Sequence, residues 1–149
     1  MSKLFEPIQV GNLRLKNRIV FPPMGTHMVS QGGFVSDRQI AYYARRAQGG
    51  AALITVEYTA VDPVQVAMLL QLRASHDDFI PGLAALAQAI KANGARAAIQ
   101  LHHPGRQALP RITGTQAVAP SPIAGPGQTE LPRELTVGEI LEIQAKFAQ

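Results

Sequence analysis

Three short, mainly apolar runs lie at residues 18–21, 51–56 and 95–101, and the segments between them carry apolar residues at intervals of three or four. Each run begins after a glycine or stops at a proline. Continuous apolar runs of this length are typical of strands buried on both faces of a parallel sheet, whereas the longer interval predicts helices. The pattern therefore predicts strands that alternate with helices.

The predicted helices have recognisable starts. Ser36 and Gln39 have the spacing of a capping box, in which each side chain satisfies a backbone N–H group of the starting helix. Thr136 and Glu139 repeat this spacing and predict a helix that runs to the end of the sequence. A further helix is expected at about residues 78–93.

Two segments do not fit this alternation. Residues 8–10 and 13–15 alternate apolar and polar positions around Gly11 and Asn12, which predicts a small hairpin that caps the domain. After His103 comes a long segment rich in proline and glycine, too long for a simple connection. Segments of this kind usually lie over a binding site.

The order of elements predicts about three βα units of a parallel α/β protein. A closed (β/α)₈ barrel needs about 250 residues, so 149 residues would supply a little over half that length and fewer than half of its units. A doubly wound open sheet is the competing architecture. The first strand leads into Pro22 and Gly25 without a G-x-G-x-x-G turn, so the fingerprint of a dinucleotide-binding open sheet is missing there.

Composition narrows the possible functions. Hydrophobic residues make up 46% of the chain and charged residues 16%, as in a globular protein with a sizeable core. The net charge of +4 is scattered along the chain, so no nucleic-acid partner is expected. No apolar stretch approaches the roughly 20 residues of a membrane span, and we expect a cytoplasmic protein without a membrane partner. With no cysteine, redox chemistry here would need a bound cofactor.

Ligands of parallel α/β proteins bind at the C-terminal ends of the strands. The segments that follow the predicted strands are residues 22–27, 57–60 and 100–106, and we expect them to converge in space.

The alternation of side chains along a strand separates the residues of the third strand end. Gln100 and His102 share one face, and Leu101 and His103 share the other. The Gln100 amide can donate and accept hydrogen bonds at once and would match the edge of a heterocycle, although a polar residue that closes a strand has the same pattern. Adjacent histidines on opposite faces cannot both bind one metal ion, and no metal site is expected.

The first two strand ends offer further polar groups. His27 lies in a loop near glycine and is read either as a donor to a substrate or as an ordinary surface histidine. Tyr58 offers an aromatic face and a hydroxyl group, while Glu57 is expected on the opposite side of the strand, paired with an arginine.

Several motifs, in order along the chain, resemble the N-terminal part of the old yellow enzyme family of flavin oxidoreductases. These motifs are LFEPI (4–8), LKNRIV (15–20), PPMG (22–25) and QLHHPGR (100–106). Three others look most like those of 2-enoate reductases and related NADH:flavin oxidoreductases, namely VEYTAVDP (56–63), APSPI (119–123) and PRELT (132–136). The resemblance covers essentially the whole chain.

The resemblance implies that residues 1–149 are the N-terminal portion of a TIM (β/α)₈ barrel that binds FMN, ending before its fourth strand. It implies an oxidoreductase that passes hydride from NAD(P)H through FMN to an activated C=C bond of a small-molecule substrate. The residues that it assigns to FMN are Pro22, Pro23, Met24, Gly25, Tyr58 and Gln100. Those that it assigns to the substrate are His27 and His102. No residue is assigned to the catalytic proton.

The resemblance also implies what these residues lack. Substrate-anchoring residues, an arginine at the flavin and the phosphate site are expected beyond Gln149, so the chain alone is expected to be inactive. An iron–sulfur cluster and FAD are expected only if a region beyond Gln149 supplies them. Two alternatives stay open: an amine dehydrogenase or demethylase of the same family, which has a pair similar to Glu57 and Tyr58, and a non-enzymatic half-barrel that self-associates through its open edge.

Overall fold

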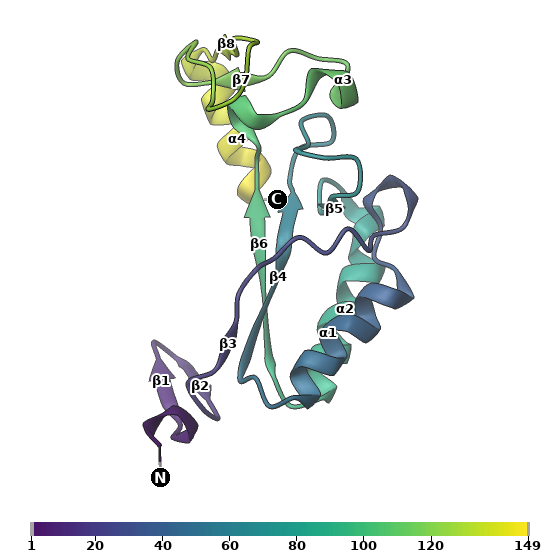
Figure 1. Ribbon diagram of the computed structural model, residues 1–149, viewed down its shortest axis with the longest axis vertical. Coiled ribbons are helices and arrows are strands. Elements are labelled where there is room, and N and C mark those ends of the chain that lie inside the picture. Colours follow the sequence, from purple (N-terminus) through teal and green to yellow (C-terminus); the bar gives the residue numbers. More distant parts are fainter. Residues whose placement is uncertain (1, 149) are drawn as a thin grey trace.

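A parallel sheet forms the centre of the computed structural model, which describes residues 2–148. Its strands are β3 (Val20–Phe21), β4 (Leu53–Ala60) and β6 (Arg96–His102), with β4 in the middle and all pairs parallel. A short strand, β5 (Leu72–Arg73), pairs with the C-terminal end of β4. Figure 1 shows the long strands β4 and β6 running side by side in the same direction. The predicted parallel strands are therefore confirmed.

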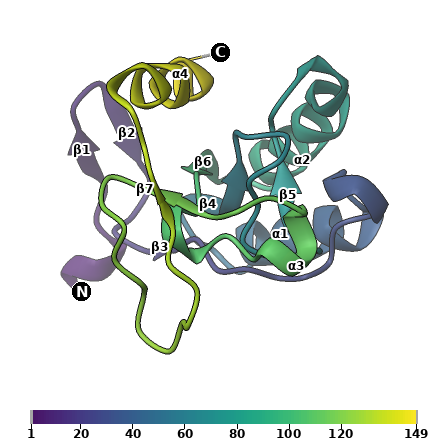
Figure 2. The same ribbon diagram turned by 90° about the horizontal axis from the view of Figure 1, so that it is seen from above.

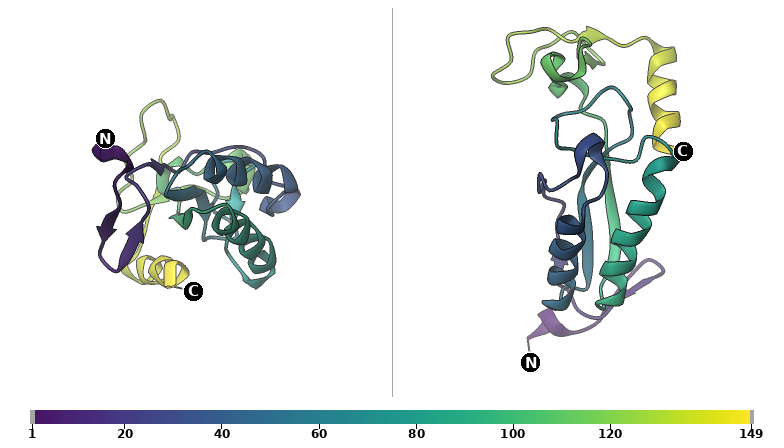
Figure 3. Two further views of the ribbon diagram at one scale, coloured as in Figure 1. Left: turned by 90° about the horizontal axis from the view of Figure 1, so that it is seen from below. Right: turned by 90° about the vertical axis from the view of Figure 1, so that its right-hand side faces the viewer.

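Two helices cover one face of this sheet. They are α1 (Asp37–Gln48) and α2 (Ile80–Ala92), which lie together on one side of the strands in Figures 1 and 3. The buried core between helices and sheet includes Tyr43 of α1, Ile54 of β4 and Ile90 of α2, each 0% exposed. Burial of these large apolar side chains holds the layers together.

The opposite face of the sheet is uncovered, which corrects the expectation of strands buried on both faces. Val20 is 48% exposed, and Ala98 and Gln100 are also exposed. The reason is that α1 and α2 pack on the same face, so within residues 2–148 no helix packs against the other one. The apolar runs of these strands show that they are suited to a layer on each side.

The middle strand is longer than predicted. It continues past Val56 to Ala60, with a shift of its pairing with β6 between Val56 and Tyr58. Such an irregularity gives a strand an extra residue and re-aims the side chains near it. The strand therefore includes the polar residues Glu57 and Tyr58, which lie near its C-terminal end.

The predicted hairpin is confirmed and lies far from the C-terminal ends of the strands. Strands β1 (Ile8–Val10) and β2 (Leu13–Leu15) pair in antiparallel fashion, with Gly11 in the turn at φ +54°. A one-turn 3₁₀ helix, η1 (Lys3–Phe5), precedes them. Figure 1 shows the hairpin at the N-terminal end of the parallel strands.

The long segment after His103 lies beyond the C-terminal ends of the strands, as Figures 1 and 2 show. It contains short elements, which are η4 (Gly105–Gln107), α3 (Pro110–Thr113), β7 (Val118–Ala119) and β8 (Arg133–Glu134). The final helix, α4 (Val137–Ala148), follows. Its capping box is confirmed, because Thr136 Oγ1 accepts from the Glu139 backbone and Glu139 accepts from the Thr136 backbone. No helix among the described residues is long and apolar enough to cross a membrane.

Only one of the two hydrogen bonds of the predicted capping box forms at the start of α1. Ser36 Oγ accepts a hydrogen bond from Gln39 N at 3.1 Å, as a capping residue does. The Gln39 side chain does not return to the helix end. It donates instead to the carboxylate of Glu57 in the neighbouring strand. A short 3₁₀ helix, η2 (Gln31–Gly33), precedes α1, and another, η3 (Asp77–Phe79), precedes α2.

Candidate functional site

The loop after β3 touches the end of β4. A Cβ atom placed on Gly25 would lie 2.5 Å from Tyr58 Cε1 and 2.9 Å from the Tyr58 hydroxyl oxygen. Ordinary carbon–carbon contacts are about 3.5–4.0 Å. Any side chain at this position would require the Tyr58 ring to move, whereas the glycine backbone packs directly on the aromatic side chain.

The end of β6 joins the same cluster. Tyr58 and Gln100 are register partners in neighbouring parallel strands, which places their side chains on the same face. His102 follows on that face, and its ring centroid lies 5.3 Å from that of Tyr58 with an angle of 64° between the ring planes. The expected convergence of three strand ends is thus observed, on the face of the sheet that no helix within residues 2–148 covers.

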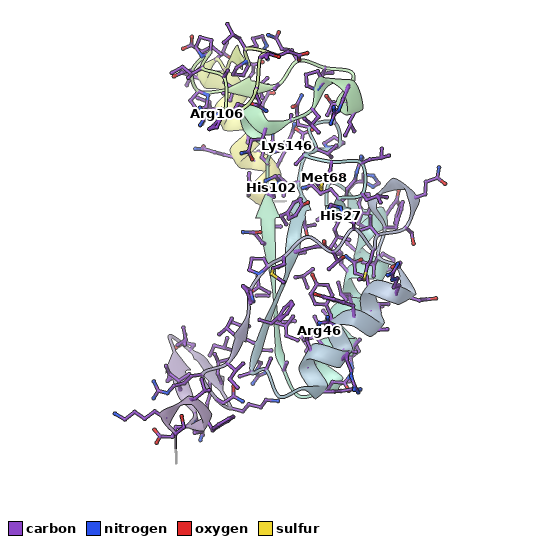
Figure 4. All side chains as sticks on the ribbon, viewed as in Figure 1. His27, Arg46, Met68, His102, Arg106 and Lys146 are labelled. Atoms are coloured by element: carbon purple, nitrogen blue, oxygen red, sulfur yellow. The ribbon has the colours of Figure 1, made fainter. Side chains whose placement is uncertain are left out.

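The other residues predicted to bind FMN or substrate lie in the loop that follows β3. Met24 is 51% exposed, Pro22 and His27 are exposed, and Pro23 is half-buried. His27 has a φ of 54°, in the left-handed region that side chains other than glycine rarely adopt. Figure 4 shows His27 at the same end of the sheet as His102.

A buried carboxylate holds this loop in place. Glu57 is 2% exposed, and its carboxylate accepts hydrogen bonds from Thr26 Oγ1 at 2.8 Å, from Thr26 N and from Gln39. Its backbone N–H donates to the hydroxyl of Tyr43 at 2.9 Å, and burial raises the pKa of Tyr43. The predicted arginine partner of Glu57 is therefore wrong. Neutral donors take its place because the carboxylate lies between the loop and α1.

The segment after β4 folds back over Tyr58 and His102. The Tyr58 hydroxyl lies 2.7 Å from the sulfur of Met68, and burial raises the pKa of Tyr58. Gln71, which is 1% exposed, lies with its Nε2 atom 3.0 Å from Nδ1 of His102. Burial lowers the pKa of His102, which favours the neutral ring. Figure 4 shows Met68 and His102 at this end of the sheet. The sequence alone gave no signal for Gln71.

His103 lies on the opposite face, as the alternation predicts. Its Nδ1 accepts from Gly105 N at 3.1 Å, and its Nε2 lies 3.8 Å from Asp62 Oδ2. Lys146 of α4 also reaches this carboxylate, with Nζ 2.6 Å from Oδ2. Burial acts to raise the pKa of Asp62, but hydrogen bonds from Lys146 and from backbone N–H groups outweigh it and lower the pKa. This cluster ties the end of the sheet to α4.

A large hollow among the described residues lies elsewhere. It is a groove of about 920 Å³ between α2, the helix-bearing face of β6 and the end of α4. Apolar side chains such as Leu83, Leu86, Ile99 and Leu101 line much of it. Tyr58, Gln100 and His102 are not among its lining residues, so the groove is separate from the cluster at the strand ends.

The cluster at the strand ends has the parts that a flat heterocycle requires. Gln100 presents an exposed amide that can donate and accept. Tyr58 offers an aromatic ring, and at Gly25 the neighbouring loop carries no side chain. In this arrangement Gln100 can form hydrogen bonds to the edge of a ring system, while Tyr58 and the loop border that ring system.

Known proteins resemble this chain along nearly its whole length. The model of the NADH:flavin oxidoreductase / NADH oxidase family matches residues 3–149. An NADH oxidase of Thermoanaerobacter brockii is 46% identical over 146 residues, which are 97% of this chain and 22% of that protein.

Solved structures of old yellow enzyme relatives also superimpose on nearly the whole chain. Morphinone reductase in complex with tetrahydroNAD superimposes with a TM-score of 0.90 and 29% identity, covering 99% of this chain and 44% of that one. An old yellow enzyme homologue from Zymomonas mobilis does so with a TM-score of 0.87 and 26% identity, covering 98% and 43%. The chain therefore spans between about a fifth and less than half of the length of these relatives. Its fold is part of their TIM barrel, and the open-sheet alternative is dismissed. The expected resemblance to the old yellow enzyme family is confirmed, and the chain belongs to that family, the NADH:flavin oxidoreductase / NADH oxidase family.

Proposed function

We propose that this chain forms the N-terminal portion of the FMN site in an oxidoreductase that passes hydride from NAD(P)H to an activated C=C bond. One observation carries the proposal. The ends of three parallel strands bring the Gln100 amide, the Tyr58 ring and the backbone at Gly25 onto one uncovered face. Ligand sites of parallel barrels are built at this end of the strands.

The chemistry of the side chains supports FMN as the ligand. The pyrimidine edge of a flavin alternates acceptors with an N–H group, and an amide such as that of Gln100 complements such an edge. Bound FMN would supply the hydride-transfer chemistry. A hydrogen bond donated by Gln100 at that edge would stabilise negative charge on the reduced ring. Tyr58 and Gly25 would border the ring.

The remaining residues would act around the ring. The hydrogen bonds of Glu57 to Thr26 fix the loop that carries Gly25 and His27, and so maintain its contact with Tyr58. His27 and His102 would contact the substrate. The NADH oxidase relative and the tetrahydroNAD complex of morphinone reductase support a nicotinamide as the hydride donor. Among substrates, we propose enoates, as in the 2-enoate reductases that the motifs resemble.

The Gln100→Ala variant tests this proposal in the protein produced from its complete gene. Loss of one donor–acceptor pair, worth about 1–3 kcal/mol, should weaken FMN binding by roughly 5- to 150-fold or shift the reduction potential. Gln88→Ala, which changes an exposed glutamine of α2, is the matched control and should alter neither. Unchanged FMN affinity and potential in Gln100→Ala would contradict the assignment.

The substrate class is tested by turnover. The FMN-loaded protein is assayed with NADH or NADPH and a panel of enoates, and separately with methylated amines and an electron acceptor. The proposal expects reduction of enoates. Oxidation of the amines alone would instead assign the protein to the amine-oxidising branch of the family.

A further inference from the structure

We propose that Gln71 is a positioning residue that fixes the tautomer of His102, so that the ring presents an Nε2–H donor to the substrate. The identity of the ring's target rests on the proposed function. The tautomer itself does not, because it follows from contacts within this chain.

The orientation of the Gln71 amide is settled by a backbone group. Gln71 Oε1 lies 2.8 Å from the backbone nitrogen of Ala67, which carries a hydrogen and can only donate. The atom that accepts this hydrogen bond must be the amide oxygen. The other end of the amide, which faces His102, is therefore the NH₂ group.

The orientation of the amide decides the state of the ring. Gln71 Nε2 lies 3.0 Å from His102 Nδ1, and an NH₂ group at this distance donates. Nδ1 must then carry a lone pair and no proton. A neutral imidazole with an unprotonated Nδ1 bears its hydrogen on Nε2, at the other edge of the ring.

The surroundings keep this arrangement rigid. Gln71 is 1% exposed, so water competes little for its amide. The Tyr58 ring packs against His102 with centroids 5.3 Å apart, and Met68 of the same segment as Gln71 holds the Tyr58 hydroxyl. Burial lowers the pKa of His102, which agrees with a ring that accepts at Nδ1 and stays neutral.

The locked tautomer favours one class of substrate group. An Nε2–H group can donate to the oxygen of a carbonyl or carboxylate, as found in an enoate. It cannot accept from a protonated amine, which has only hydrogens to offer. His102 held by Gln71 therefore selects for an oxygen acceptor in the substrate.

The direct test is ¹⁵N NMR spectroscopy of the histidine rings in the full-length protein. Four histidines lie within residues 1–149, and His102→Gln assigns the signal of interest by its loss. We expect the Nδ1 of His102 to resonate as an unprotonated nitrogen and its Nε2 as a protonated one. We also expect a scalar coupling across the hydrogen bond between Gln71 Nε2 and His102 Nδ1. A protonated Nδ1 in the wild-type protein at neutral pH would overturn the proposal.

The Gln71→Glu variant gives the second test. A glutamate can still accept from Ala67, but its other oxygen would accept from His102, so Nδ1 should gain a proton. Gln65→Glu is the matched control, because Gln65 is a buried glutamine in the same segment that bonds to Thr115 and does not contact His102. In that control the His102 signals should keep their wild-type pattern.

His103 supplies an internal reference, because its Nδ1 accepts from a backbone N–H and should stay unprotonated in every variant. An unprotonated His102 Nδ1 in folded Gln71→Glu would overturn the proposal. If Gln71→Glu does not fold, the wild-type shifts and the scalar coupling decide. If the tautomer is as expected but no enoate is reduced, only the proposed function falls.

Discussion

The contact between Gly25 and Tyr58 makes a quantitative prediction about the Gly25→Ala variant. The added Cβ would lie 2.5 Å from Tyr58 Cε1, so the ring must retreat by about 1 Å to restore an ordinary contact. The Tyr58 hydroxyl contacts Met68 and the ring packs against that of His102, so this movement disturbs both contacts. Overpacking of this kind costs about 1–3 kcal/mol.

A double-mutant cycle isolates this cost. In a Tyr58→Ala background the same alanine meets no ring, and it should be neutral or stabilise by about 0.4–1 kcal/mol by restricting the unfolded chain. Because the ring is partly exposed and can yield, we expect a coupling energy of about 1–2 kcal/mol between the two positions. The free energy of unfolding is measured by urea denaturation followed by circular dichroism, since the chain has no tryptophan.

A second glycine serves as the control. A Cβ on Gly138 would meet only Thr136 Oγ1, at 3.9 Å, so Gly138→Ala in α4 should be neutral or stabilise by up to about 1 kcal/mol. A coupling energy below about 0.5 kcal/mol between Gly25 and Tyr58 would contradict a close contact between them. The loop after β3 would then not pack against the end of β4 in solution.

Two other substitutions test the buried carboxylates. Glu57→Gln turns an NH₂ group toward donors and should lower the free energy of unfolding by about 1–3 kcal/mol, whereas exposed Glu134→Gln should change it by less than about 0.5. Lys146→Met should cost roughly 1–2 kcal/mol, because it removes a partly exposed ionic partner of Asp62. The pKa of Asp62 is lowered in the folded state. The destabilisation caused by Lys146→Met should therefore have its full size above pH ~4 and should vanish as acid protonates the carboxylate. Urea denaturation across pH tests both, and a Lys146→Met effect that grows toward low pH would be inconsistent with the ion pair.

Local patterns were sufficient to predict the parallel strands and the hairpin. The alternation of side chains also separated His102 from His103 correctly, because strand geometry fixes which residues share a face. The three strand ends were expected to meet, since parallel strands carry their C-terminal ends to one edge. These parts depend only on neighbours along the chain and on general rules of sheet geometry.

Contacts between distant segments could not be predicted in this way. Gln39 has the spacing of a capping residue, but its amide donates to the carboxylate of Glu57 instead of bonding the helix end. Gln71 reaches His102 across 31 positions of sequence, through a loop whose path no periodicity describes. The uncovered face of the sheet was missed for a similar reason, because an apolar strand does not tell which layer covers each side.

The central claim is that the ends of three strands hold one flat heterocycle on the uncovered face. It is tested most directly by titrating the ¹⁵N-labelled protein with FMN and following its backbone amide and glutamine side-chain signals. We expect the signals of Gly25, Tyr58 and Gln100 to shift together along one binding curve, while those of the β1–β2 hairpin stay fixed. Shifts confined to the hairpin or to the groove beside α2, with these three residues unmoved at saturation, would contradict it.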